Sequence, residues 1–344
     1  MIELKIIRVR TQPTPKDESR FINETEKKIP NPGVNSTRGK HIAQRHASEW
    51  LNYGNPDDWD VEFESAVLNT VDNLKIGQMK PSDMIEHFEK VRYTIAHKRK
   101  NADTYEFGLR RDTIPCSSPL EIHSYTQIIP SELTYGYALE RAITIPYDGK
   151  HFIESQSNNG KYWADNSFYK REKQGPLRYG LVQGFINGDP IPLTQYVYCS
   201  RTEKHRLYES EKWFSELEVD YIGDNKESAI WLHTGADQIP VVLKHIQELI
   251  DKAVAGDLTV IPRIHWWYVH LTPVCRGSGG IAEMLTNTLC RLNGVDLPRW
   301  KDGVAPSVET LLEPNEEKFC ENYHKLFASE DSLNNLFTSP LNLK

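Results

Sequence analysis

Two helical patterns joined by a glycine-rich loop lie at Ile261–Leu292, and this feature constrains the fold more than any other. The stretch reads IPRIHWWYVHLTPVCRGSGGIAEMLTNTLCRL. Its apolar residues recur at helical spacing over 261–271 and again from about 280 to 293. Gly294 follows in the position where a glycine commonly ends a helix. The sequence therefore predicts a helix–loop–helix, which is where we expect the protein to act.

The loop has the composition of an anion-binding site. It consists of Arg276, Gly277, Ser278, Gly279 and Gly280. Glycines let a backbone wrap around a ligand, and the N-terminus of the following helix adds partial positive charge. Arg276 adds a full charge with a two-pronged fork, so the group suits a diphosphate. The alternative is a glycine-rich connection without a ligand, because the pattern is neither a P-loop nor a Rossmann fingerprint.

The helix before the loop carries a second set of candidates. Its aromatic run, His265-Trp266-Trp267-Tyr268, is of a kind that more often forms core than binds a ligand. Arg263 differs, because a charged group at the start of a largely apolar helix needs a partner. That partner is either a carboxylate in a buried ion pair or a bound anion. Cys275 is a reactive thiol only if the helix N-terminus lowers its pKa.

The rest of the chain divides by composition. Residues 11–40 are rich in Pro, Lys, Asn, Ser and Thr, and we predict a flexible arm over 1–40. Helical spacing appears at 40–52, 61–74 and 81–99, with Ser82 as an N-cap. Further helices are predicted at 240–255, 307–312 and 316–327. The fold class is therefore mainly α, with a helical core from 41–110 and 231–344.

The middle of the chain, 111–230, is predicted to be an inserted lobe of mixed α/β character. Short β-prone runs such as SYTQII, AITIPY and HFIES occur there between loops. Two longer runs meet at Asn187-Gly188, a strong hairpin signal, so we expect a β-hairpin at about Tyr179–Tyr198. Pro190 and Pro192 predict that its second strand is an edge strand.

Composition excludes several classes of function. The net charge is −7 and the only basic run is the short Lys98-Arg99-Lys100, which argues against nucleic acid as a partner. No run of eighteen apolar residues exists, and the first twenty residues lack a signal-peptide core, so we expect a soluble protein without a membrane span. The five cysteines are scattered without a CxxC pair, so neither a zinc site nor a disulfide framework follows.

With these residues in view, the chain resembles the AvrB family of bacterial effectors, within the Fic/Doc/AvrB (Fido) superfamily. RIHWWYVHLTPVCRGSGGIAEM is similar to the family's Arg-x-His-Trp-Trp helix followed by Pro-x-x-Arg-Gly-Ser and a new helix. LNGVDLPRWKDGVAPSVETLL and EEKFCENYHKLF resemble its C-terminal part in order and spacing. INGDPIPLTQYV is similar to its His-Gly-Asn-Val-Ile-Pro-Leu turn. The resemblance covers 258–327 and extends to the hairpin.

The same stretch departs from the Fic motif, His-Pro-Phe-x-Asp/Glu-Gly-Asn-Gly-Arg, at its chemically important positions. Pro273, Gly277 and Gly279 match this motif. Thr272 stands where Fic enzymes have their catalytic histidine, Ser278 replaces the asparagine, and Gly280 replaces the arginine. A threonine does not act as a general base at neutral pH. The departure therefore argues against ordinary adenylyl transfer.

What the resemblance implies is a Fido-type helical bundle with an inserted second lobe and a nucleotide-holding cleft. It implies a glycosyltransferase that moves a sugar or deoxysugar from a nucleotide-diphosphate sugar to a hydroxyl of a protein acceptor. The catalytic positions would be Arg263, Thr272 and Arg276, with His265 and the loop 276–280 holding the nucleotide. An acceptor would dock on the hairpin 179–198 by strand addition. We expect no metal and no tightly bound cofactor, and a location in the cytoplasm or in a host cell reached without a signal peptide.

Two other interpretations stay open. One is a Fic-like nucleotidyl or phosphoryl transferase in which His270 or His265 replaces the missing base. The other is a non-catalytic protein that binds a nucleotide or a partner through the cleft and the hairpin. Thr272 argues against the first, and an arginine-bearing phosphate loop argues against a pure adaptor.

Overall fold

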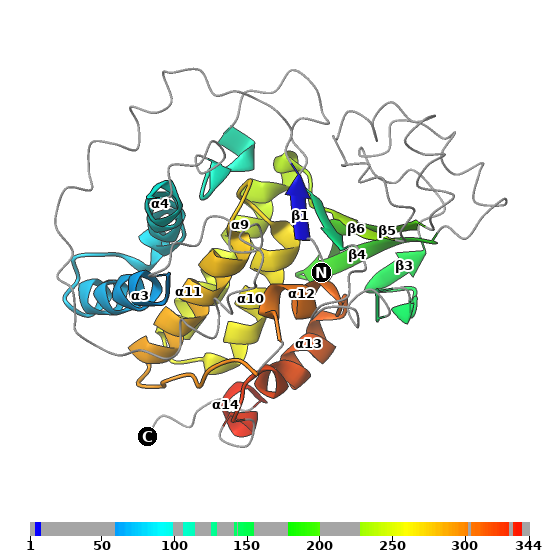
Figure 1. Cartoon of the computed structure of the whole chain (residues 1–344). Helices are drawn as coiled ribbons and strands as arrows, with labels where there is room; N and C mark the ends of the chain where they lie inside the picture. Colours follow the sequence, from blue (N-terminus) through cyan, green and yellow to red (C-terminus); the bar gives the residue numbers. More distant parts are fainter. Residues whose placement is uncertain are drawn as a thin grey trace.

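A computed structural model places the chain's helices on one side and its strands on the other (Figure 1). The residues that the structure describes are 4–7, 59–98, 106–113, 125–128, 141–142, 144–154, 178–199, 228–301, 304–329 and 333–338. The helix predicted at 40–52, and most of the arm predicted at 1–40, lie outside these residues. Within them the protein is mostly helical, with one antiparallel sheet, and this agrees with the predicted fold class.

Three consecutive helices form the centre of the molecule. They are α9 (Ile239–Val254), α10 (Ile261–Leu271) and α11 (Ser278–Leu292). The prediction of a helix–loop–helix at 261–292 is therefore confirmed, with α11 beginning two residues earlier than expected. α11 packs against α9, α10 and two helices from the N-terminal half, which is why its sequence is buried on nearly every side.

Those two N-terminal helices are α3 (Trp59–Lys75) and α4 (Met84–His97). Both cover α11, on the side away from the sheet (Figure 1). The expected N-cap at Ser82 is wrong. A short 3₁₀ turn, η1 (Pro81–Asp83), precedes α4, so Asp83 is the N-cap residue, and the Ser82 hydroxyl donates to the Asp83 carboxylate at 3.0 Å.

Short helices close the C-terminal end. They are α12 (Pro306–Leu311), α13 (Glu316–Asn322), the 3₁₀ turn η8 (Tyr323–Leu326) and α14 (Asn334–Thr338). The single helix expected at 316–327 is thus an α-helix that tightens into a 3₁₀ turn. α12 and α13 both pack on α10, so they lie against the layer of central helices.

The sheet has six strands, and every neighbouring pair is antiparallel. The strands are β1 (Leu4–Ile7), β2 (Tyr125–Ile128), β3 (Phe152–Glu154), β4 (Arg178–Ile186), β5 (Asp189–Cys199) and β6 (Ser228–Leu232), in the spatial order β1-β2-β6-β5-β4-β3. Two of the three short β-prone runs form strands, whereas AITIPY at 142–147 does not. Residues 4–7 join the sheet as β1, and the arm at 1–40 otherwise stays a prediction.

The hairpin β4–β5 is confirmed, including its turn. Asn187 and Gly188 both have positive φ (53° and 89°), the conformation that the Asn-Gly pair favours. The prediction of β5 as an edge strand is wrong for its second half, because 195–199 pairs with β6 as well as with β4. The first half carries Pro190 and Pro192 and extends beyond β6, so the prolines lie where only β4 is paired.

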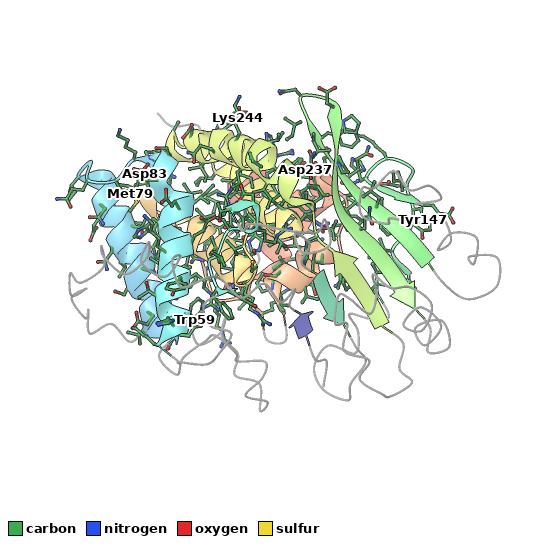
Figure 2. The ribbon with its side chains drawn as sticks, turned by 90° about the horizontal axis from the view of Figure 1, so that it is seen from above. Trp59, Met79, Asp83, Tyr147, Asp237 and Lys244 are labelled. Atoms are coloured by element: carbon green, nitrogen blue, oxygen red, sulfur yellow. The ribbon has the colours of Figure 1, made fainter. Side chains whose placement is uncertain are left out.

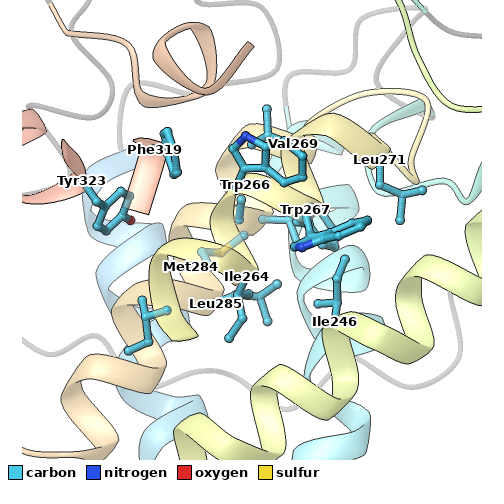
Figure 3. Packing of buried hydrophobic residues seen from close by; sticks show 14 of the residues in the cluster. Ile246, Ile264, Trp266, Trp267, Val269, Leu271, Met284, Leu285, Phe319 and Tyr323 are labelled. Atoms are coloured by element: carbon cyan, nitrogen blue, oxygen red, sulfur yellow. The ribbon is translucent and has the colours of Figure 1, made fainter. Parts of the chain in front are cut away.

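The sheet and the helices share one continuous hydrophobic core among the described residues. Trp266 and Trp267 of α10 lie at its centre, with Ile246 from α9 and Leu285 from α11 beside them (Figure 3). Gly184 of β4 rests directly on the Trp267 indole, which leaves no space for a Cβ atom. Seen from above, the central helices lie between the α3–α4 pair and the sheet (Figure 2). The boundaries of the inserted lobe, 111 and 230, stay a prediction, although β6 crosses the second of them.

Within the part of the chain that the structure describes, no helix is both long enough and apolar enough to cross a membrane.

The close approach of β4 to α10 yields a stability prediction. Gly184→Ala should lower the free energy of unfolding by about 1–3 kcal/mol, because the added methyl group forces the hairpin away from Trp267. Urea unfolding followed by tryptophan fluorescence measures this. Val241→Ala, at a half-exposed position of α9, should change stability by less than about 0.5 kcal/mol. Equal effects of the two substitutions would contradict the packing described here.

Candidate functional site

Thr272 ends the helix that leads into the loop. It adopts a left-handed conformation (φ 44°, ψ 66°), its N–H donates to the Tyr268 carbonyl, and its hydroxyl donates to the Val269 carbonyl at 2.7 Å. These bonds satisfy carbonyl oxygens that a helix end otherwise leaves unpaired. Thr272 therefore has a structural role as a helix cap, and the catalytic role implied by the family resemblance stays a prediction.

The buried side chain of Arg111 donates hydrogen bonds to carbonyl oxygens at the end of α10. The Arg111 Nε donates to the Thr272 carbonyl at 2.7 Å, and Nη2 donates to the carbonyls of Leu271 (2.9 Å) and Thr234 (2.7 Å). A cation at a helix C-terminus is favourable because the last carbonyls carry partial negative charge. Arg111 is 2% exposed, so these bonds form away from competing water.

The segment 106–111 forms two isolated β-bridges with the residues that lead into the loop and fixes their backbone. Four backbone hydrogen bonds join the two: Gly108 N–H to Arg276 O, Arg276 N–H to Glu106 O, Cys275 N–H to Leu109 O, and Arg111 N–H to Pro273 O, at 2.9–3.2 Å. The loop is therefore held rigidly on one side before α11 begins. A rigid loop can present its remaining groups to a ligand without a large loss of conformational entropy.

The glycines at the start of α11 have packing reasons of their own. Gly277 is in the left-handed region (φ 89°), and a Cβ there would lie 2.8 Å from Arg92 Cγ. A Cβ at Gly279 would collide with the Ser307 hydroxyl, and one at Gly280 would lie 3.3 Å from the Trp59 ring. The glycine cluster alone is thus no evidence of a ligand, because neighbouring side chains already require it.

Arg276 is engaged by an acidic partner. Its Nε donates to Glu106 Oε2 at 2.6 Å, with the two side chains 12% and 9% exposed. The guanidinium carbon also lies 6.0 Å from the centroid of the Phe107 ring. The structure places Arg276 beside the N-terminus of α11, as the sequence predicts, but with Glu106 fixing one edge of its fork.

The surroundings of the loop are completed by Trp59 of α3, Arg92 of α4 and Phe107. Arg92 lies between the rings of Trp59 and Phe107, at 4.7 Å and 4.4 Å from their centroids. Burial lowers the pKa of Arg92 to about 9, so it still carries a charge at neutral pH. Trp59 Nε1 and Ser278 Oγ are buried and have no hydrogen-bond partner among the described residues. None of Trp59, Phe107 and Arg92 was predicted from the sequence to belong to the site.

An acidic group lies one turn away on the same face of α4. Glu89 has its Oε1 3.7 Å from Arg110 Nη1, and that oxygen accepts no hydrogen bond from the described part of the chain. Burial raises the pKa of Glu89 to about 8, although Arg110 opposes this shift. Tyr268 of α10 is close enough for Glu89 to raise its pKa further, after burial. Charged residues within the apolar stripe of 85, 88 and 95 were the sequence signal that could have identified both Glu89 and Arg92.

Arg263 does not share this site. It lies at the start of α10, whose eleven residues span about 16 Å, whereas the loop follows the other end. Its Nη1 forms an ion pair with Glu316 of α13. Burial lowers the pKa of Arg263, but Glu316 more than compensates and the net shift is upward. The sequence left a carboxylate and a bound anion open as partners of Arg263, and the structure shows the carboxylate. Arg263 does not lie beside the loop, contrary to the expectation that the two share a cleft.

His265 is also remote from the loop. Its side chain is fully buried against Trp300, Phe319 and Tyr323, with Nδ1 3.0 Å from the Tyr323 hydroxyl. Burial lowers its pKa to about 3, so it is neutral. The expectation that it contributes to the nucleotide-binding loop is therefore wrong about its position, because its face of α10 packs against the C-terminal helices.

His270 occupies a buried junction between α10, β5 and α12. Its Nδ1 is 3.3 Å from Thr194 Oγ1, and its Nε2 is 3.1 Å from the Thr310 carbonyl. Burial lowers its pKa to about 3. Both ring nitrogens are thus within hydrogen-bonding distance of structural groups, which gives no support to His270 as a relocated base.

The sequence of this chain matches a known protein family. The sequence profile of the AvrB_AvrC family, described as avirulence protein, matches residues 145–330. This chain belongs to the AvrB_AvrC family. Avirulence protein B of Pseudomonas savastanoi pv. glycinea is 32% identical over 104 residues. That alignment includes 28% of this chain and 32% of the relative, so the chain spans about a third of the relative's length.

The family match contains only part of the site. Arg276, the glycines and Ser278 lie inside 145–330, as do the hairpin and α10. Trp59, Arg92 and Phe107, which complete the surroundings of the loop, lie before residue 145. The AvrB_AvrC region therefore supplies one half of the site, and the N-terminal helices supply the other.

The contacts of Arg111 give a second stability prediction. Arg111→Met should lower the free energy of unfolding by about 1–3 kcal/mol, because buried carbonyls of Leu271, Thr272 and Thr234 lose their donors. Arg141→Met is the matched control, since Arg141 is 45% exposed and pairs with Glu309 at the surface. It should cost at most about 1 kcal/mol. Chemical denaturation measures both, and an unaffected Arg111→Met protein would contradict the proposed role of this residue.

Glu89 gives a pH-dependent prediction. Unfolded glutamate loses its proton near 4.5, whereas folded Glu89 retains its proton until about 8, so folding takes up a proton between these values. Stability should therefore fall as pH rises through this window, by at most about 1.4 kcal/mol per pH unit from this group. Glu89→Gln should remove this part of the slope and be the more stable protein at pH 8. Glu86→Gln, at an exposed position of the same helix, should leave the slope unchanged.

Proposed function

We propose that this member of the AvrB_AvrC family is a bacterial effector with glycosyltransferase activity. It would move a sugar or deoxysugar from a nucleotide-diphosphate sugar to a hydroxyl of a protein acceptor, after delivery to a host cell. The observation that carries the proposal is the N-terminus of α11. It follows a glycine in the left-handed conformation, has no side-chain cap, and has Arg276 beside it. A Fido-type arrangement of the helices belongs to this proposal as well.

The chemistry requires stabilisation of a departing diphosphate. The bond between the sugar's anomeric carbon and the phosphate oxygen breaks, and the nucleoside diphosphate leaves with the electron pair. The acceptor hydroxyl oxygen forms the new bond to the same carbon, and its proton passes to the departing diphosphate. Preorganised N–H groups and a guanidinium stabilise the negative charge that develops on the leaving phosphate. Arg276 and the first amides of α11 are the groups in position for this.

No metal or tightly bound cofactor enters the proposal. The nucleotide-sugar is a substrate, held by its diphosphate at Arg276, Gly277, Ser278, Gly279 and Gly280.

The alternative of a Fic-like nucleotidyl transferase receives less support. It requires a base at the target hydroxyl, and the Thr272 hydroxyl is used to cap α10. His265 and His270 are buried, neutral and held by other groups. A non-catalytic binding protein is the second candidate, and it shares the anion site while predicting no change in mass of any acceptor.

The hairpin is the place we assign to the acceptor. β3 pairs with β4 only at 180–182, so the β4 backbone from Gly184 to Ile186 extends beyond its neighbour. On the opposite side, Pro190 and Pro192 remove two N–H donors from β5. Among the described residues this edge of β4 has no neighbouring strand beyond β3, so it is the better template for an added strand from a protein acceptor.

The proposal is tested first by ligand-dependent stability. Nucleotide-diphosphate sugars should raise the melting temperature of the full chain, because a ligand that binds only the folded state stabilises it. Arg276→Met should abolish this shift. Arg263→Met should retain it, since that arginine also forms an ion pair but lies at the other end of α10.

Intact-mass analysis of acceptor proteins then identifies the reaction. A sugar increment supports the glycosyltransferase, and a nucleotide increment supports the Fic-like alternative. A melting-temperature shift without any mass change supports the binding protein. Absence of a shift with every nucleotide-sugar and nucleotide would contradict both transferase hypotheses.

A further inference from the structure

Two buried hydrogen-bond donors near the start of α11 have no partner among the described residues. They are Trp59 Nε1, on a residue that is 2% exposed, and Ser278 Oγ, on a residue that is 7% exposed. Trp59 belongs to α3 and its ring lies 3.3 Å from the Cβ position of Gly280, so it approaches the first turn of α11. A buried donor without an acceptor costs folding free energy, and such groups call for an explanation.

The charges around these donors favour an anion. An indole N–H and a guanidinium can only donate, and a serine hydroxyl can also donate. The Arg92 side chain lies 2.8–2.9 Å from the Cβ position of Gly277, directly below the loop. Of the acids nearby, Glu106 is in an ion pair with Arg276, and the pKa of Glu89 is raised by burial, which reduces its negative charge near neutral pH.

We propose that Arg92, Trp59 Nε1 and Ser278 Oγ form a second phosphate subsite next to Arg276, so that the loop binds a diphosphate with one arginine for each phosphate. This inference rests on the proposed function, because it concerns the same loop. It assigns the class of ligand that the loop binds, and it adds Trp59 and Arg92, which lie outside the AvrB_AvrC match. The subsite is reached over Gly277, Gly279 and Gly280, whose backbone is partly exposed.

The position of Phe107 explains why the ligand has two phosphates. The guanidinium carbons of Arg92 and Arg276 lie 4.4 Å and 6.0 Å from the centroid of this one ring. Both guanidinium groups therefore lie near the same ring. Two phosphates that share a bridging oxygen can meet one guanidinium each, whereas orthophosphate meets one of them fully.

The subsite also joins parts of the chain that are distant in sequence. Trp59 and Arg92 lie in α3 and α4, before the region matched by the family, and Ser278 lies inside it. Preference among phosphate ligands would therefore depend on residues of the N-terminal helices. A relative that shares only 145–330 would keep Arg276 and the glycines without this second subsite.

The test is calorimetric titration of the full chain with sodium pyrophosphate and with sodium orthophosphate. The wild-type protein should bind pyrophosphate at least about tenfold more tightly, because only pyrophosphate engages both arginines. Arg92→Met should weaken pyrophosphate binding by about tenfold or more and leave orthophosphate binding within about threefold. Trp59→Phe, which keeps a ring and removes the N–H, should weaken it by a smaller factor. Lys90→Met, an exposed cation of the same helix, should have no effect.

Folding is checked separately. Replacing a buried charge by an apolar residue of similar size is often neutral for stability, so Arg92→Met should remain folded by near-ultraviolet circular dichroism. If it unfolds, Trp59→Phe and Ser278→Ala carry the same test. Equal affinity of the wild type for the two anions, or unchanged pyrophosphate affinity in folded Arg92→Met, overturns the subsite.

The outcome is separable from that of the proposed function. A sugar increment on an acceptor that persists in Arg92→Met, with pyrophosphate affinity unchanged, refutes the subsite and leaves the transferase. Pyrophosphate binding that depends on Arg92, together with no change in any acceptor's mass, refutes the transferase and leaves the subsite.

Discussion

The arrangement of the site depends on the hydrogen bonds of one buried guanidinium. Arg111 donates to carbonyl oxygens of Thr234, Leu271 and Thr272, which lie 123 to 161 positions later in the chain. It thereby docks the segment 106–113 against the end of α10, and the backbone pairing of 106–111 with the loop follows from that docking. Because this pairing fixes Arg276 and brings Phe107 to the loop, the position of Arg276 before α11 depends on Arg111. A surface ion pair could not do this, since water competes for its partners.

The composition of the glycine-rich loop has two possible causes, which are close packing of neighbouring side chains and binding of an anion. Different residues bear on each. Gly277, Gly279 and Gly280 are required because Arg92, Ser307 and Trp59 occupy the space that side chains would need. The same close packing brings donor groups to the first turn of α11, where backbone N–H groups already favour an anion. Composition alone could not distinguish a packed connection from a binding loop. The unpartnered donors Trp59 Nε1 and Ser278 Oγ are what favour the binding loop.

Two of the predicted site residues lie away from the loop, because residues that are neighbours in sequence on a helix face different parts of the molecule. Arg263 and His265 belong to the same motif as the loop, yet α10 carries them away from it along its axis and turns them towards α13 and η8. Thr272 lies where the motif places it, but its hydroxyl is used within its own helix end. The expected N-cap at Ser82 failed because a 3₁₀ turn moves the start of α4 by one residue.

The sequence by itself determined the elements whose signals are local. Helical spacing and the glycines located α10, the loop and α11, and the Asn-Gly pair located the hairpin, because each depends on residues only a few positions apart. The tertiary structure alone decided which groups surround the loop. Arg92 and Trp59 come from helices that precede α11 by about two hundred residues, and Glu106 pairs with Arg276 across 170 positions. Such contacts have no periodicity in the chain, since they arise from packing of the α3–α4 pair on α11. The helix–loop–helix could thus be predicted from the sequence, whereas the residues of α3 and α4 that lie beside it could not.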